Sequence, residues 1–356
     1  MSDSPAPIGD SPRRKAGGAP AAAELRAAFD RHDAVTVGLE EELMLLDPET
    51  LGLSPRAAAA VAELDDPRLK IEMPAAQLEI VTGPHATVAA AAAELAEARR
   101  RLAARHRVAG AGVHPFASGL GPLNPGRRYE AIAAEYVSVA HRQLVFGLHV
   151  HVAIPGADRA LAVYNALRSH LPDLAALAAN APFYEGSDSG LASVRPRISG
   201  LLPRQGIPPA LDSFEAYADA LRWCGFDDPR QWWWELRLHP IFGTVEIRVP
   251  DTQATIADTA AVATVAYELA TRVPPGPPAE SWKLDQNRWA AGRHGLDAVM
   301  TDPHTGERAT ARERLARALG HAPPELAGAA RQRALAAADG VHGLVRTLAD
   351  EFASQV

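Results

Sequence analysis

Apolar and polar residues alternate along several short stretches of the chain, and this alternation predicts β-strands with one apolar and one polar face. The clearest stretch is 35–47, which reads VTVGLEEELMLLD and ends at an Asp-Pro turn. The other strand candidates are 68–82, 107–115, 143–154, 231–240 and 243–251. The last two are separated by a short Ile-Phe link, as in an antiparallel hairpin.

Stretches rich in helix-forming residues lie between these strands. The most regular is 86–107, which carries basic residues in its last turns, where they suit the helix dipole. Further helices are expected near 54–64, 126–142, 157–179, 213–223, 255–272, 311–318 and 324–352. Because the strands alternate in polarity, we predict an α+β fold with a mainly antiparallel sheet, covered by helices on one face and open on the other.

The first twenty residues differ in composition from the rest of the chain. Residues 1–20 are rich in Pro, Gly, Ser and Ala with scattered charge, which predicts a disordered N-terminal tail. The remainder has neither a fixed repeat nor a long linker that would divide it. We therefore expect a single domain over 33–354.

The composition narrows the class of partner. With 36 basic and 43 acidic residues and a formal net charge of −7, the chain lacks the cationic field that favours nucleic acid or an anionic membrane surface. Its single cysteine excludes an intrachain disulfide and a cysteine-based zinc site, and it contains no run of about eighteen apolar residues. We expect a cytoplasmic protein with small-molecule partners, and a homodimer or higher homo-oligomer stays open.

Charged and imidazole side chains fall on the polar face of five predicted strands. Because side chains alternate in direction along a strand, Glu40 and Glu42 share one face. The same rule groups the polar residues of the other strands as Gln77 with Glu79, His149 with His151, Glu235 with Arg237 and His239, and Glu246 with Arg248. Glu41 points the other way, so we expect it at a sheet end or paired with an arginine.

For any one strand, a solvated polar face is the simpler interpretation. Together, however, the five strands offer carboxylate and imidazole groups with arginine beside them. Oxygen ligands with one imidazole suit Mg²⁺ or Mn²⁺, arginine suits phosphate or carboxylate groups, and clustered carboxylates repel one another unless cations lie between them. The pattern therefore predicts a divalent metal site, and alternation leaves open whether His149, His151 or both bind the metal.

Six segments follow one another from about residue 35 onward: GLEEELMLLDPET, QLEIVTG, FGLHVHVAI, NAPFYEGSDSGLASVRPRISGLLPRQGIP, HPIFGTVEIRVPDTQ and NRWAAGRHGLD. Together they resemble the glutamate-cysteine ligase type 2 family, also called the YbdK-like carboxylate-amine ligases, which have a glutamine synthetase-like fold. The resemblance implies a curved sheet with an active-site funnel on its open face. It also implies ATP-dependent formation of an amide bond through an acyl-phosphate, with glutamate plus cysteine or another amine as candidate substrates.

The resemblance also implies roles for individual residues. The metal ligands it implies, for Mg²⁺ or Mn²⁺, are Glu40, Glu42, Glu79 and Glu246 with His149 or His151 beside them. The arginines it places at the phosphate or the substrate carboxylate are Arg195, Arg237 and Arg248, of which Arg195 and Arg248 would also bind ATP. The segment NAPFYEGSDSG and the sequence VPDTQ depart from the family pattern, which bears on the substrate pocket and spares these ligands.

Two other functions fit the same residues. One is an ATP-dependent phosphotransferase that releases its phosphorylated product without ligation, and the other is a non-catalytic nucleotide or metabolite sensor. The sequence contains none of GxxxxGK[ST], GxGxxG after a strand and HExxH, so a nucleotide would be held through metals, arginines and loops. The run of Trp232, Trp233 and Trp234 could stack on adenine, but we interpret it as core and sheet edge.

Overall fold

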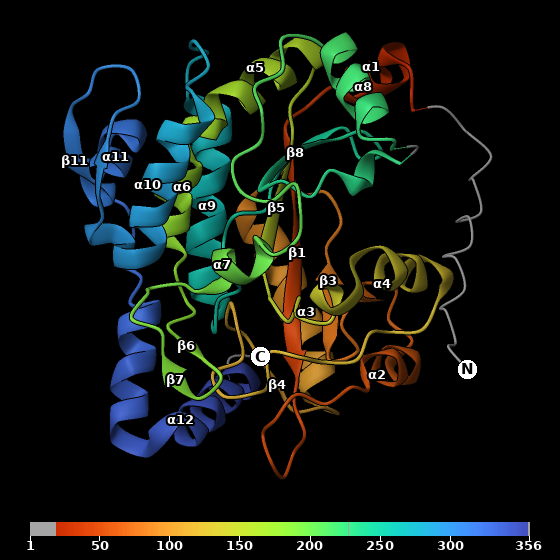
Figure 1. Ribbon diagram of the computed structural model, residues 1–356, viewed down its shortest axis with the longest axis vertical. Helices are drawn as coiled ribbons and strands as arrows, with labels where there is room; N and C mark the ends of the chain where they lie inside the picture. The colour runs from red at the N-terminus through yellow and green to blue at the C-terminus, as the bar shows by residue number, and fades with distance from the viewer. Residues whose placement is uncertain (1–18, 227, 355–356) are drawn as a thin grey trace, which may run out of the picture.

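The computed structural model describes residues 19–226 and 228–354, and a mainly antiparallel sheet runs through its centre (Figure 1). Seven strands of the described residues form this sheet in the order β2-β3-β1-β5-β9-β8, with β4 paired to β1. Their bounds are β1 Thr36–Leu45, β2 Leu69–Ile71, β3 Gln77–Val81, β4 Val108–Ala109, β5 Leu148–Ala153, β8 Leu236–His239 and β9 Thr244–Ile247. All of these pairings are antiparallel, which confirms the predicted fold class and the β8–β9 hairpin.

Strand β1 lies between β3 and β5, and its residues alternate in burial as the sequence predicts. Val37, Leu39 and Leu43 are fully buried on one side, whereas Glu40 and Glu42 are partly exposed on the other. Burial of each large apolar side chain contributes about 1.5–3 kcal/mol. Since a slip of one residue would exchange the two faces, this burial fixes the register of the strand.

Three helices cover the apolar face of the sheet: α3 Val88–Ala103, α5 Ala157–Leu167 and α9 Ile256–Arg272. A threonine hydroxyl caps the start of two of them. Thr87 accepts a hydrogen bond from the Ala90 amide at 3.2 Å, and Thr255 accepts one from the Asp258 amide at 3.0 Å. Such caps satisfy amides that the helix itself leaves without a partner, which helps to define where α3 and α9 begin.

The polar face is less open than the strand pattern predicts. Helix α4 Arg127–Ala140 and the short helix α7 Arg195–Ser199 contribute side chains to the same pocket as the polar residues of the strands. Both helices lie in front of the sheet in Figure 1. The alternation of polarity within a strand is a local property, so it cannot reveal that distant segments border this face.

Several predicted elements are interrupted or shorter than expected, among them 68–82, 157–179 and 107–115. The strand 68–82 splits into β2 and β3 around Pro74, which has no amide hydrogen for strand pairing. The helix 157–179 splits into α5, a 3₁₀ turn (η1 Arg168–His170) and α6 Leu171–Leu177, where Pro172 begins the new helix. Of the strand 107–115, only β4 forms.

The remaining elements surround this framework. They are α1 Ala22–Asp30, α2 Ala57–Leu64, α8 Phe214–Trp223, α10 Ser281–His294, α11 Ala311–Leu319, α12 Gly328–Ser354, the 3₁₀ turns η2 Pro229–Gln231 and η3 Gly295–Asp297, and the hairpins β6 Phe183–Tyr184 with β7 Ser187–Asp188 and β10 Val299–Thr301 with β11 Arg308–Thr310. Helices α1 and α10 and the two small hairpins had no counterpart in the sequence prediction.

The main buried cluster of apolar side chains extends from Leu25 in α1 to Phe352 in α12. This shared core supports the single domain over 33–354, which stays a prediction. The predicted tail falls almost wholly on residues 1–18, which lie outside the described residues. In the part of the chain that the structure describes, no helix has both the length and the apolar character needed to cross a membrane.

Candidate functional site

The register of the sheet gathers the predicted polar side chains on one face. The residues that lie opposite one another on neighbouring strands are Glu42 and Glu79, Glu40 and His149, His151 and Glu246, and Glu246 and Arg237. Since β3, β1, β5, β9 and β8 are consecutive in the sheet, residues that are far apart in sequence form one polar cluster. The predicted site residues of these five strands are therefore brought together.

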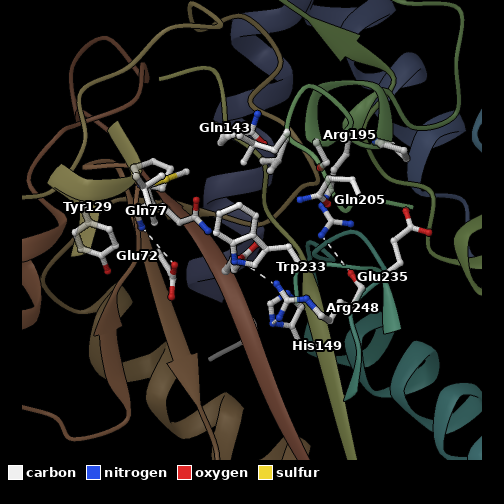
Figure 2. A pocket seen from close by; sticks show the side chains of 18 of the residues that line it. Glu72, Gln77, Tyr129, Gln143, His149, Arg195, Gln205, Trp233, Glu235 and Arg248 are labelled. Carbon is white, nitrogen blue, oxygen red and sulfur yellow. Dashed lines mark hydrogen bonds and ion pairs between the residues drawn. The ribbon is translucent and has the colours of Figure 1, made fainter. Parts of the chain in front are cut away.

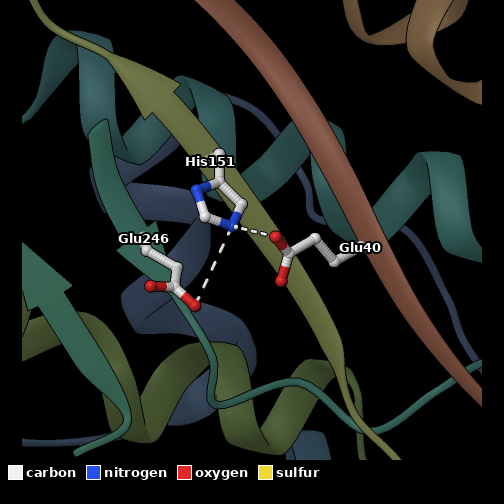
Figure 3. A group of neighbouring side chains, drawn as sticks. All are labelled: Glu40, His151 and Glu246. Atoms are coloured by element: carbon white, nitrogen blue, oxygen red, sulfur yellow. Dashed lines mark ion pairs between the residues drawn. The ribbon is translucent and has the colours of Figure 1, made fainter. Parts of the chain in front are cut away.

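Two groups of three side chains in this cluster have the spacing of metal ligands. They are Glu40, Glu79 and His149, and Glu40, His151 and Glu246, the second of which is drawn in Figure 3. In each group the ligand atoms lie within 4.8 Å of one another. Glu40 belongs to both groups, and its carboxylate lies 3.1 Å from Nδ1 of His149 and 3.2 Å from Nε2 of His151.

The carboxylates of the cluster are crowded enough to change their pKa values. Burial, and then the charges of Glu40, Glu72 and Glu42, raise the pKa of Glu79 well above its usual range. Burial also raises the pKa of Glu42 to about 7, although the charge of Arg195 opposes this shift. A divalent cation among these groups would relieve both the repulsion and the cost of burial, so the donor set fits Mg²⁺ or Mn²⁺.

The two histidines differ in their electrostatic surroundings. Burial, and then the charge of Arg248, lower the pKa of His149 to about 4, so its imidazole is neutral at pH 7, as metal binding requires. Burial acts in the same direction on His151, but the carboxylates of Glu40 and Glu246 raise its pKa above the ordinary value. His149 is therefore better prepared to bind a metal ion than His151.

Two arginines neutralise the fully buried carboxylate of Glu246. Arg237 donates to it from Nε at 2.5 Å and from Nη2 at 2.9 Å, and Arg248 donates from Nη1 at 2.5 Å. Such compensation is needed because an unpaired buried charge is strongly unfavourable. Arg248 also lines the pocket, so of the two it is the one placed to contact a ligand there.

Arg195, in the first turn of α7, is held by main-chain carbonyl groups. Its Nη1 donates to the carbonyl of Val249 at 3.1 Å and its Nη2 to that of Arg248 at 3.3 Å. Its buried Nε has no hydrogen-bond partner among the described residues, which is unusual for a buried donor. Gly147 packs against this guanidinium and donates its amide to Oε2 of Glu42 at 2.5 Å.

Glu41 lies on the opposite side of β1, as the alternation predicts. It is fully buried and forms an ion pair with the fully buried Arg99 of α3. The expectation that Glu41 pairs with an arginine is confirmed. This residue therefore cannot be a ligand in the pocket on the other face of the sheet.

Two other residues of the predicted polar face have different partners. Glu235 lines the pocket but forms an ion pair with Arg288 of α10 at 2.8 Å. His239 stacks on Phe242 with a ring distance of 4.4 Å, and burial lowers its pKa to about 3. Neither residue belongs to the two groups of candidate metal ligands.

A pocket lies beside the first group of ligands, between the sheet, α4 and α7, and of that group His149 alone lines it (Figure 2). In this view Glu72, Gln77 and Tyr129 lie on one side of the pocket, and Arg195 and Arg248 lie on the other. The two kinds of charge are not separated, because Arg128 lies 5.8 Å above the ring of Tyr129 and Glu235 lies on the side of Arg195 and Arg248. The pocket as a whole therefore offers carboxylates for a divalent cation and guanidinium groups for phosphate.

Several pocket residues were not singled out from the sequence: Glu72, Arg128, Tyr129, Gln143 and Gln205. A signal was available for Glu72. Lys70 in β2 lies opposite Glu79, and continued alternation carries the same face to the carboxylate two residues later. The residues of α4 and of the loop after α7 carry no comparable pattern, because only the tertiary fold brings them to the sheet.

The three consecutive tryptophans have different environments. Trp232 is buried and packs against Tyr217, with a ring distance of 5.3 Å, as the structural interpretation expects. Trp233 instead lines the pocket, where Arg204 lies 5.0 Å above its ring and Tyr136 lies 5.6 Å away. Trp233 therefore lies at the pocket and not in the core, and its direction depends on the turn before β8.

Comparisons with known proteins agree with this fold. Residues 36–351 match the family model described as Glutamate-cysteine ligase family 2 (GCS2). The "Putative glutamate--cysteine ligase 2-3" of Rubrobacter xylanophilus is 39% identical over 309 residues, which cover 83% of this chain and 85% of that protein. The "Putative glutamate--cysteine ligase 2-1" of Frankia alni is 33% identical over 309 residues, with 80% and 81% covered.

Solved structures of other ligases share the fold at low sequence identity. The glutamate–cysteine ligase of Francisella tularensis, solved in complex with AMP, superposes with a TM-score of 0.66 at 12% identity over 90% of this chain and 89% of that one. A bifunctional glutathione synthetase of Pasteurella multocida gives a TM-score of 0.57 at 16% identity over 94% of this chain and 54% of that one. With the family match over nearly the whole described chain, these findings show that the protein belongs to glutamate-cysteine ligase family 2 and is an ATP-dependent carbon–nitrogen ligase.

Proposed function

We propose that this chain activates a carboxylate with ATP as an acyl-phosphate, assisted by a divalent metal ion, and joins it to an amine. The observation that carries the proposal is the position of Glu40, which belongs to both groups of candidate ligands. Arg248, which lines the adjoining pocket together with His149, adds a cationic group for phosphate. The family match supports ligation, and the relative solved with AMP supports an adenine nucleotide as co-substrate.

The first group, Glu40, Glu79 and His149, is the better candidate for Mg²⁺ or Mn²⁺. It combines two carboxylates with a neutral imidazole, and Glu42 lies opposite Glu79 in the neighbouring strand. In the second group, two arginines already occupy the carboxylate of Glu246. We propose that Glu246 and His151 serve a second cation only when Arg248 turns toward a bound phosphate.

The arginines would have separate tasks. Arg195 and Arg248 line the pocket and would bind the phosphates of ATP and the reacting carboxylate. Arg237 donates two hydrogen bonds to Glu246, so we propose that it acts by holding this carboxylate in place. This narrows the role of Arg237 that the sequence resemblance implied.

The proposed reaction has two steps. A carboxylate oxygen of the acid attacks the γ-phosphorus of ATP and ADP leaves, and the amine nitrogen then attacks the acyl carbon and phosphate leaves. The first step brings anionic groups together, so Arg195 and Arg248 would lower its barrier by offsetting their charge. A divalent cation, when bound, supplies further positive charge at the phosphate oxygens. The walls formed by α4 and Trp233 would limit hydrolysis of the acyl-phosphate by water.

The proposal extends to the identity of the acid and the amine. The curated relatives are named for glutamate and cysteine, so glutamate is our first candidate for the acid and cysteine or another amine for the nucleophile. A cytoplasmic location with small-molecule partners belongs to the same proposal. A γ-glutamyl amide would be the product if both first candidates are correct.

The proposal is tested by incubation of the protein with ATP, Mg²⁺ or Mn²⁺, and pooled amino acids and amines, followed by mass spectrometry. We expect a condensation product, with one ADP and one phosphate formed for each amide. ADP should form as fast as in this complete reaction only when the acid and the amine are both present. An Arg272→Lys variant, altered at an exposed ion pair of α9 remote from the pocket, should behave as the wild type.

Other outcomes would favour the alternative functions. A stable phosphorylated acid or amine without an amide product would indicate a phosphotransferase. Binding of ATP with metal but no turnover over the whole panel would indicate a sensor. Either result would refute the ligase proposal for this site.

Metal affinity is expected to rise with pH between about 6 and 8. Burial raises the pKa of Glu42 to about 7 and that of Glu79 well above its usual range, so protons compete with the cation below these values. For each proton that the metal ion displaces, the metal affinity rises by up to about tenfold per pH unit. Calorimetric titration of Mn²⁺ in two buffers of different ionisation enthalpy measures the protons released.

The variant Glu42→Gln isolates the contribution of one carboxylate to this pH dependence. It removes a group with a pKa of about 7, so fewer protons should be released near pH 6.5. Equal Mn²⁺ affinity at pH 6 and pH 8 in the wild type would contradict the proposed ligands.

A further inference from the structure

Glu41 takes no part in the proposed reaction, yet in β1 it lies between Glu40 and Glu42, which belong to the polar cluster. Its carboxylate accepts hydrogen bonds from Nε of Arg99 at 2.7 Å, from Nη2 of the same arginine and from the Thr259 hydroxyl at 3.1 Å. Glu41 and Arg99 are both fully buried. Thr259 belongs to α9, so the contacts of one carboxylate join strand β1 to helices α3 and α9.

Arg99 also binds the chain segment 249–254, which follows β9. Its Nη1 donates to the carbonyl of Ala254 and its Nη2 to the carbonyl of Gln253, both at 3.1 Å. The ring of Phe352 in α12 lies 4.7 Å from the guanidinium carbon. The planar guanidinium therefore fixes the end of this segment against the core-facing side of β1.

The same segment reaches around to the pocket side of the sheet. The Thr252 hydroxyl donates to the main-chain carbonyl of Glu42 at 2.8 Å. The carbonyl of Val249 holds Arg195, and the carboxylate of Asp251 lies 3.7 Å from this guanidinium. A few residues of chain thus connect Arg99 in the core with Glu42 and Arg195 in the pocket.

Stability alone does not account for a buried ion pair at this position. Removing two charges from water is costly, and well-packed apolar residues in place of a buried ion pair are often as stable or more stable. A guanidinium with two carbonyls and one carboxylate as acceptors does provide a fixed geometry. The contacts of Arg99 are therefore better explained by a role in positioning segment 249–254 than by a contribution of the ion pair to stability.

We propose that Glu41 and Arg99 are positioning residues, which set the distance between Glu42 and Arg195 through segment 249–254. The inference rests on the proposed function, in which Glu42 borders the metal site and Arg195 binds the reacting anion. Neither Glu41 nor Arg99 touches the pocket. Substitution of either residue should therefore weaken metal binding and lower kcat by displacing Glu42 and Arg195. The candidate metal ligands Glu40, Glu79 and His149 should keep their positions.

The test compares Arg99→Lys with a matched control, Arg314→Lys. Arg314 is also a largely buried arginine that donates to a buried carboxylate, Asp173, at 2.8 Å, but it joins α11 to α6 away from the pocket. Both variants keep the charge and lose the planar fork, so they should lower the melting temperature to a similar degree. Only Arg99→Lys should raise the Kd for Mn²⁺, measured by electron paramagnetic resonance of the free ion, by about tenfold. It should also lower kcat more than it raises KM for ATP.

A second variant covers the case in which Arg99→Lys does not fold. Glu41→Leu combined with Arg99→Met removes both charges and leaves none unpaired, so the core should remain folded. The carbonyls of Gln253 and Ala254 then lose their donors. We again expect about tenfold weaker Mn²⁺ binding, together with faster hydrogen exchange in segment 249–254.

The inference would be overturned if a folded Arg99→Lys or double variant kept the wild-type Mn²⁺ affinity and kcat. The ion pair of Glu41 and Arg99 would then have a purely structural role. A wild-type protein that binds no Mn²⁺ would refute the proposed function instead. Hydrogen exchange then decides the inference separately. Faster exchange confined to 249–254 would support it, and unchanged protection there would overturn it.

Discussion

Replacement of Glu40 by glutamine is expected to lower kcat by about 10³-fold and to abolish Mn²⁺ binding at micromolar concentrations. Glu40 is the residue shared by the two groups of candidate ligands, so its loss affects both. Glutamine has the same size but offers one neutral carbonyl oxygen to a cation in place of a charged carboxylate. Steady-state kinetics and titration of Mn²⁺ measure the two effects.

The fold should survive this substitution. Burial opposes the ionised form of Glu40, but the charge of His151 and hydrogen bonds from both histidines hold its pKa well below the usual range. Loss of this charge removes an ion pair with His151 and also reduces the repulsion that raises the pKa of Glu79. These two effects have opposite signs, so we expect a small change in melting temperature.

The matched control for this prediction is Glu268→Gln. Glu268 is also a partly buried glutamate with a histidine and an arginine as partners, His321 and Arg272, but it lies in α9 on the far side of the sheet. The control should keep wild-type kcat and Mn²⁺ affinity. If Glu40→Gln retains more than about a tenth of the wild-type kcat, neither group of ligands holds a catalytic cation.

The sequence was sufficient to predict which side chains share the polar face. In β1 the period of two residues is a local consequence of the extended backbone, so Glu40 and Glu42 could be separated from Glu41 without knowledge of the fold. The same period grouped His149 with His151 and Glu246 with Arg248. The order of the strands in the sheet, which joins these residues into one cluster, was not predicted. The alternating polarity and the family resemblance indicated an antiparallel sheet with one open face.

The rest of the pocket depends on contacts between distant segments. Glu72 stands where Pro74 interrupts the strand 68–82, and this interruption was missed. Arg128 and Tyr129 reach the pocket only because α4 lies over the polar face. Likewise, the pairing of Glu246 with two arginines depends on side-chain directions that alternation does not distinguish from metal binding.

Replacement of Gly147 by alanine is expected to lower kcat by about 10²-fold while the melting temperature changes little. A β-carbon at this position would overlap Nη2 of Arg195 and lie 3.3 Å from Oε2 of Glu42. The backbone of Gly147 is outside the left-handed region, so alanine adds no conformational strain. The end of a long arginine side chain moves more easily than a strand in the middle of a sheet, so Arg195 should give way.

Such a shift matters because catalysis depends on geometry more steeply than stability does. Displacement of a positioning group by about 1 Å can cost about 10²-fold in rate. Gly83→Ala is the control, since a β-carbon there meets Glu94 at an ordinary 3.7 Å. Wild-type kcat in a fully folded Gly147→Ala would show that the position of Arg195 is not critical. A parallel loss of kcat and melting temperature would show instead that the strand yields and the arginine stays. The expected pattern, a loss of rate without a loss of stability, would connect Arg195 to the reaction through a residue that has no side chain to take part in it.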